Sequence, residues 1–134
     1  MLLLADNYDT SDDKTGCGNP RLSVERAALL LGNKDINALA RRVAHSFRPV
    51  FGYRSHDGKA RSAENFVIYT DEQDTYVAAI NYTDTPLSGT LPLEILGLTG
   101  TCDVLELWTG EWQQRCSSLN YNVPAKDARI YRLR

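Results

Sequence analysis

The sequence predicts a mainly β protein: an antiparallel β-sandwich of about six to eight strands with an N-terminal helical segment. After Ser62, apolar and polar residues alternate with the period of two that is typical of strands, and short turn-forming segments separate these runs. Helical spacing occurs only before residue 46. Short strands joined by short turns favour a sandwich. Because the periodicity changes from helical to strand-like along the chain, we expect two parts, residues 1–46 and residues 47–134.

The N-terminal part combines a short strand, an acidic loop and two helices. The apolar run Met1–Ala5 predicts the strand, and the loop after it lacks the Gly and Glu that a calcium-binding loop needs, so no metal site is expected. Ser23 can cap a helix that ends near Gly32, and a second helix is expected from Asp35 to about Ala44. The apolar stripes of both helices are too small for independent folding.

The second part begins with a basic connection, residues 47–62, and continues as strands rich in β-branched and aromatic residues. The segment Cys102–Thr109 is apolar on both alternating faces, which predicts a central strand with Leu107 buried and Trp108 within the strand. Pro92 predicts an edge strand or a strand start. The expected strands are Asn65–Thr70, Thr75–Thr83, Leu91–Ile95, Cys102–Thr109, Leu119–Val123 and Ala128–Leu133.

Charge and cysteine content exclude several classes of function. The chain has 15 basic and 17 acidic residues, which is far from the strongly basic balance of nucleic-acid-binding proteins. No apolar run is long enough to cross a bilayer, so no membrane partner is expected, and no signal for a particular localisation is present. Three widely spaced cysteines predict neither zinc nor another cofactor, and a Cys102–Cys116 bridge across a hairpin stays open.

The order of several short motifs resembles a known family. A strand ending in Asn81 precedes a Thr-Asp turn, and the turn LGL at residues 96–98 leads to the acidic-Leu-Trp segment Glu106–Trp108, closed by Thr-Gly. The turn Val123–Ala125 precedes a final strand of Arg-x-Tyr type. This order resembles the C-terminal β-sandwich that follows the catalytic barrel in melibiase-type α-galactosidases. Upstream, LLLADN and ERAALLLGNKDINALAR are similar to the last strand and helix of that barrel.

The resemblance implies an accessory region of an α-galactosidase-like glycoside hydrolase. Residues 1–46 would be the remnant of a (β/α)8 barrel, and the partner would be the catalytic barrel of the same protein. In the resembled family both catalytic aspartates lie on earlier barrel strands, so no catalytic residue is expected here. Asp6 and Asn7 would follow the last barrel strand at the active-site face, and they are candidate substrate contacts. Trp108 is a third candidate, because an aromatic face can stack on a sugar ring.

Two alternatives to the accessory role remain open: an independent carbohydrate-binding sandwich, and a structural or interaction domain unrelated to sugar. The helical segment favours the accessory role, because a self-contained sandwich has no need of two amphipathic helices. A homodimer through an exposed helical face is a further expectation. Asn81–Thr83 matches a glycosylation acceptor, although its place at a strand end argues against modification.

Overall fold

The computed structural model describes residues 28–29, 31–50 and 65–134. The predicted strand Met1–Ala5, the acidic loop and the start of the first helix lie outside these residues, whereas residues 28–29 and 31–32 are helical as expected. Contacts divide the chain into two compact units, Met1–Ser46 and Phe47–Arg134. Within the described residues, no helix has the length and apolar character that crossing a membrane requires.

The first unit contains helix α2, Lys34–Arg42. The side-chain oxygen of Asn33 caps it by accepting hydrogen bonds from the amides of Asp35 and Ile36 at 3.1 and 3.0 Å. Ile36 and Leu39 lie one turn apart on the same face of the helix, and both are buried. The structure therefore confirms the second predicted helix, which begins one residue earlier and ends two residues earlier than expected.

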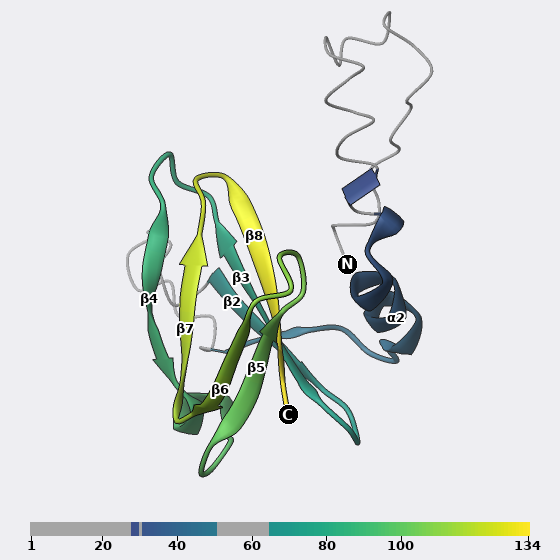
Figure 1. Ribbon diagram of the computed structural model, residues 1–134, viewed down its shortest axis with the longest axis vertical. Coiled ribbons are helices and arrows are strands. Elements are labelled where there is room, and N and C mark those ends of the chain that lie inside the picture. The colour runs from purple at the N-terminus through teal and green to yellow at the C-terminus, as the bar shows by residue number, and fades with distance from the viewer. Residues whose placement is uncertain (1–27, 30, 51–64) are drawn as a thin grey trace, which may run out of the picture. The chain divides into compact units, whose positions relative to one another are not determined.

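The second unit is an antiparallel sandwich of two sheets (Figure 1). The larger sheet has the strand order β1-β2-β3-β8-β5-β6, and the smaller sheet pairs β4 with β7. This architecture confirms the predicted fold class. The strands are β1 (Arg48–Pro49), β2 (Phe66–Thr70), β3 (Thr75–Asn81), β4 (Leu87–Pro92), β5 (Cys102–Glu106), β6 (Trp112–Cys116), β7 (Ser118–Val123) and β8 (Asp127–Leu133).

Two strand predictions need correction. The strand expected at Leu91–Ile95 lies earlier, because β4 ends at Pro92 and the chain continues as the 3-10 helix η3, Leu93–Leu96. Proline has no amide hydrogen for a sheet ladder and starts helical turns readily, which explains the change at this residue. The strand expected at Cys102–Thr109 ends at Glu106, so Trp108 lies in the following turn and the additional strand β6 returns from it.

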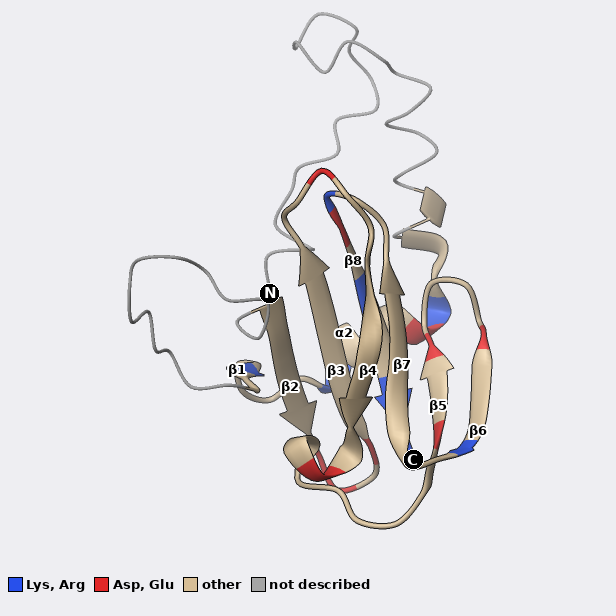
Figure 2. Cartoon of the chain, turned by 90° about the vertical axis from the view of Figure 1, so that its left-hand side faces the viewer, with Lys and Arg blue, Asp and Glu red and all other residues tan. Residues whose placement is uncertain are grey.

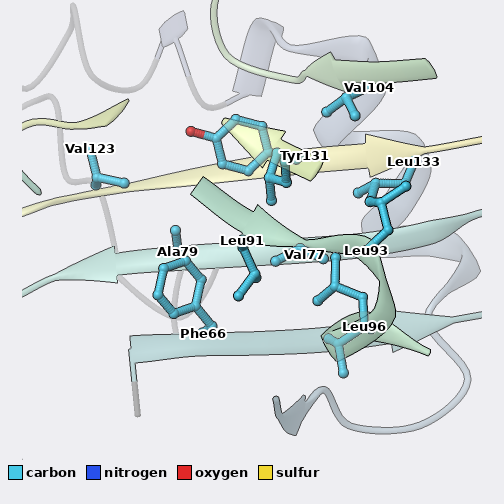
Figure 3. Packing of buried hydrophobic residues seen from close by; sticks show 12 residues of the cluster. Phe66, Val77, Ala79, Leu91, Leu93, Leu96, Val104, Val123, Tyr131 and Leu133 are labelled. Carbon is cyan, nitrogen blue, oxygen red and sulfur yellow. The ribbon is translucent and has the colours of Figure 1, made fainter. Parts of the chain in front are cut away.

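The inward faces of the two sheets form one apolar core (Figure 3). Val77 and Val104 from the larger sheet and Leu119 and Val123 from the smaller sheet have no measurable exposure. Leu93 of η3 joins them at 1% exposure. The chain therefore completes its core by closing the smaller sheet and the 3-10 helix over the larger sheet.

The opposite face of the larger sheet is also apolar. Tyr69 of β2 is paired in register with Tyr76 of β3, and Ala78 of β3 is paired with Ile130 of β8. These side chains and Leu105 of β5 are only 2–6% exposed. The prediction that Cys102–Thr109 has two apolar faces is confirmed for β5, where Val104 points into the core and Leu105 points to the opposite face.

Candidate functional site

A polar cleft of about 360 Å³ opens between the β5–β6 hairpin, β7 and β8. We call it the interlayer cleft. Strands β4 and β7 carry no charged residue (Figure 2), so the charges around this cleft come from the hairpin and from β8. The lining residues with the clearest chemical roles are Glu106, Glu111, Gln113, Asn120, Arg129 and Tyr131.

Glu106 is a buried carboxylate at the end of β5, with 5% exposure. One of its oxygens accepts a hydrogen bond from the amide of Trp108 at 3.0 Å, and the other accepts from the amide and the hydroxyl of Thr109, both at 2.6 Å. The carboxylate thus provides hydrogen-bond acceptors for the amides of Trp108 and Thr109, which lie in the turn beyond the end of β5. Because both oxygens are engaged in this way, Glu106 holds the hairpin turn and does not present a free nucleophile.

Gln113 of β6 connects the hairpin to β7. Its side-chain nitrogen donates a hydrogen bond to the carbonyl of Asn120 at 2.8 Å, and its side-chain oxygen accepts one from the amide of Asn120 at 3.2 Å. The amide side chain therefore occupies the hydrogen-bonding position that a neighbouring strand would take beside β7. This pair sets the position of the hairpin at one wall of the interlayer cleft.

Tyr131 of β8 is a buried residue of the cleft lining, with 3% exposure. Its hydroxyl oxygen accepts a hydrogen bond from the amide of Asn122 at 3.3 Å. Burial of the phenol, with a contribution from Glu106, raises the pKa of Tyr131 from 10.0 to about 12. Tyr131 is therefore neutral at physiological pH and keeps a hydroxyl hydrogen that it can donate. Arg129 of the same strand forms an ion pair with Asp127 at 2.7 Å.

The second buried carboxylate of the described residues is also engaged. Asp74, at 3% exposure, accepts two hydrogen bonds from the guanidinium of Arg134 at 2.7 and 3.1 Å, and a third from the hydroxyl of Tyr76 at 3.3 Å. Within the described part of the chain, no group of three or more His, Cys, Asp and Glu side chains could hold a metal ion. The groups of the interlayer cleft that can donate hydrogen bonds to a polar ligand are side-chain amides, the phenol of Tyr131 and the guanidinium of Arg129.

Of the three sequence-predicted site residues, the structure describes only Trp108. Asp6 and Asn7 lie outside the described residues. Trp108 is half-buried in the hairpin turn, outside the lining of the interlayer cleft, and its indole nitrogen is buried without a hydrogen-bond partner among the described residues. The exposed aromatic ring of this hairpin is Trp112, at 55% exposure, with the guanidinium carbon of Arg132 6.0 Å from the ring centre.

Sequence reasoning missed the residues of the interlayer cleft. Gln113 and Arg129 carry no motif, and Asn120 belongs to a regular alternation that predicts an exposed strand face. Only the pairing of the two layers brings these side chains to one place. The glycosylation pattern at Asn81 is explained differently, because Asn81 is 1% exposed and its side chain is hydrogen-bonded within the protein.

The fold and the cleft define a two-layer antiparallel β-sandwich domain in which the described buried carboxylates hold the structure together. The family described as the alpha galactosidase C-terminal beta sandwich domain, Melibiase_C, matches residues 66–133. The match covers just over half of the 134 residues, and the chain belongs to this family. The resemblance found in the sequence is confirmed. A comparison with curated proteins finds no match.

Solved structures of glycoside hydrolases share the fold. A GH27 β-L-arabinopyranosidase from Geobacillus stearothermophilus has a TM-score of 0.61 and 17% identity over 81% of this chain and 23% of its own. The α-galactosidase I from Mortierella vinacea has a TM-score of 0.59 and 14% identity over 81% of this chain and 28% of its own. The chain thus spans about a quarter of the length of these structures, in which the matching region is part of a longer enzyme.

Proposed function

We propose that this chain is the C-terminal accessory region of an α-galactosidase-like glycoside hydrolase, and that it supports the catalytic barrel without performing chemistry itself. The observation that carries the proposal is the state of the two buried carboxylates of the described residues. Retaining glycosidases need one carboxylate as a nucleophile and another as an acid and base, about 5 Å apart. Asp74 is bound by Arg134 and Tyr76, and Glu106 is bound by the hairpin turn. Both therefore serve the fold.

The two apolar faces of the larger sheet support a packing role in the parent enzyme. An antiparallel sheet in a free-standing sandwich usually has one face on the core and one face in water. Here the face opposite the smaller sheet carries the largely apolar side chains of Tyr69, Tyr76, Ala78 and Ile130. We propose that this face serves the attachment of the sandwich to the rest of the enzyme.

The proposal assigns residues 1–46 to the end of a barrel, because LLLADN and ERAALLLGNKDINALAR are similar in sequence to the last strand and helix of such a barrel. In this proposal Asp6 and Asn7 border the substrate cleft of the complete enzyme. The exposed Leu29 and Leu31, at 56% and 63% exposure, are the residues through which a homodimer would form.

The experiment that tests the accessory role combines activity and binding on the 134-residue chain. A chromogenic α-galactoside is incubated with the protein, and galactose and melibiose are titrated while Trp fluorescence is followed. We expect neither hydrolysis nor saturable binding. Hydrolysis of the α-galactoside by the purified chain would overturn the proposal, because it would place a working pair of catalytic carboxylates within this chain.

Saturable sugar binding would support the second candidate, an independent carbohydrate-binding domain. The hydrogen-bonding groups of the interlayer cleft favour this candidate, and two variants would locate the site. Tyr131→Phe removes a hydroxyl from the interlayer cleft, whereas Trp108→Phe changes the aromatic ring outside it. A weakened affinity in the first variant alone would assign binding to the interlayer cleft, and a weakened affinity in the second alone would assign it to the Trp108 platform.

A further inference from the structure

The β5–β6 hairpin places two cysteines directly opposite each other. Cys102 of β5 is paired in register with Cys116 of β6, and both are free thiols that are half-buried. The amide and carbonyl of Asp103 face Arg134 at the end of β8, so those of Cys102 face β6 by the alternation of antiparallel strands. Hydrogen-bonded pairs of this kind have Cα atoms about 5.5 Å apart, a separation common in disulfides.

Both thiols also point to the same face of the sheet, since directly opposite residues always do. Cβ atoms of such pairs lie about 4.5–5.5 Å apart, and a disulfide needs about 3.8 Å, so the strands must approach by roughly 1 Å. Strand β6 can supply this movement, because it is the edge of the larger sheet. Its register with β5 shifts between Cys102 and Val104, and Arg115 beside Cys116 has a positive φ of 49°.

We propose that Cys102 and Cys116 form a cross-strand disulfide when the protein meets a small-molecule disulfide as oxidant. The thiolate of one cysteine attacks the sulfur–sulfur bond of the oxidant, which gives a mixed disulfide and releases one small thiolate. The second cysteine then attacks the mixed disulfide, forms the bond between the strands and releases the second small thiolate. The protein loses two protons and two electrons, and one oxidant molecule becomes two thiols.

The surroundings favour Cys116 as the first thiol to react. Burial raises the pKa of the Cys102 thiol, and the nearby Cys116 and Asp103 raise it further, so less of Cys102 is present as thiolate. Cys116 itself lies on the edge strand, where its thiol donates only a weak hydrogen bond to the carbonyl of Gln114 at 3.4 Å.

The bond would close the hairpin that forms one wall of the interlayer cleft. The segment between the two cysteines contains Glu106 and Gln113, which hold the turn and the link to β7. Linking the two ends of this segment restricts the unfolded chain and limits the separation of β5 from β6. We therefore expect the oxidised protein to be more stable than the reduced protein, with a Tm that is higher by on the order of 5–10 °C.

The test uses the full chain with Cys17→Ser as the reference, so that only the two hairpin thiols remain. The reference is incubated with oxidised glutathione and examined by intact mass, thiol titration and thermal unfolding. We expect the loss of both thiols and of the mass of two hydrogen atoms, without a bound glutathione. The matched controls Cys102→Ser and Cys116→Ser should each stop at a mixed disulfide with glutathione.

Two results would overturn the proposal. Retention of two glutathione molecules by the reference would mean that the thiols cannot reach each other. A covalent dimer on a non-reducing gel would mean that they react between chains instead of within the hairpin. A disulfide of the expected mass with an unchanged Tm would refute the claim that the bond restrains the hairpin.

Discussion

Asn81 provides the sharpest test of how the sandwich is held together. Its side-chain nitrogen donates hydrogen bonds to the carbonyls of Thr85, Val123 and Pro124 at 2.8, 3.1 and 2.9 Å. Its side-chain oxygen accepts from the amide and hydroxyl of Thr83 at 3.0 and 2.7 Å. One side chain at the end of β3 therefore joins the β3–β4 turn to the β7–β8 turn. Asn81→Asp preserves the shape and the accepting oxygen, and it removes the donors.

The expected loss follows from these contacts. The two amide hydrogens of Asn81 serve three carbonyl oxygens, and a buried carbonyl without a partner costs about 1–3 kcal/mol. Asn81→Asp should therefore lower the free energy of unfolding by about 3–5 kcal/mol, a large part of the roughly 5–15 kcal/mol typical of one domain. Burial among carbonyl oxygens should raise the pKa of the new carboxyl group. The folded variant then binds its proton more tightly than the unfolded chain, so the loss grows as pH rises above about 4.

Urea denaturation followed by circular dichroism measures this loss, at pH 7 and again near pH 4. The matched control is Asn122→Asp, the same substitution at an exposed position where the side-chain oxygen accepts from Ser88 at 2.9 Å. The control should change stability by no more than about 0.5 kcal/mol. If the two variants lose the same amount, or if the loss of Asn81→Asp relative to the wild-type protein is larger near pH 4 than at pH 7, the role assigned to Asn81 is wrong.

Three further predictions concern packing and ionisation. Leu107→Ala should cost on the order of 2–5 kcal/mol in urea unfolding, since Leu107 is only 3% exposed; a loss below about 1 kcal/mol would contradict its burial. Gly89→Ala places a Cβ 2.8 Å from the ring carbon Cζ of Tyr121, so unfolding measurements should show a loss of about 1–3 kcal/mol that largely disappears in a Tyr121→Ala background. The raised pKa of Tyr131 means that the unfolded chain loses this proton first, so stability should fall between about pH 10 and about pH 12, and Tyr131→Phe should flatten this decline. Equal alkaline slopes for both proteins would refute that assignment.

The secondary structure could be predicted well where a single local cause acts. The alternation in Thr75–Thr83 and Ala128–Leu133 predicts β3 and β8, and the apolar spacing after Asn33 predicts α2. The ends of strands were harder to predict, because they depend on hydrogen bonds between side chains and the backbone of the next turn. The strand after Cys102 ends at Glu106 since its carboxylate binds the next turn, which no periodicity indicates.

The candidate site could be predicted far less well. Trp108 is a reasonable sugar platform by residue type, yet its ring is half-buried in a turn. Gln113 and Asn120 are ordinary polar residues in the sequence, and their hydrogen bonds join strands that belong to different sheets. Which polar side chains meet in the interlayer cleft follows from the packing of the two layers, and composition or spacing does not report it.

The class of the fold and most of its strands could be predicted from the residues, because apolar periodicity and turn residues act over a few neighbouring positions, and the order of short motifs indicated the family. The three-dimensional structure was needed to show which residues stabilise the fold and which line the interlayer cleft. It assigns the carboxylates of Asp74 and Glu106 to structural hydrogen bonds and brings Cys102 opposite Cys116. The physical reason is that strand register and layer packing depend on contacts between residues distant in sequence, whose free energies the local pattern does not contain.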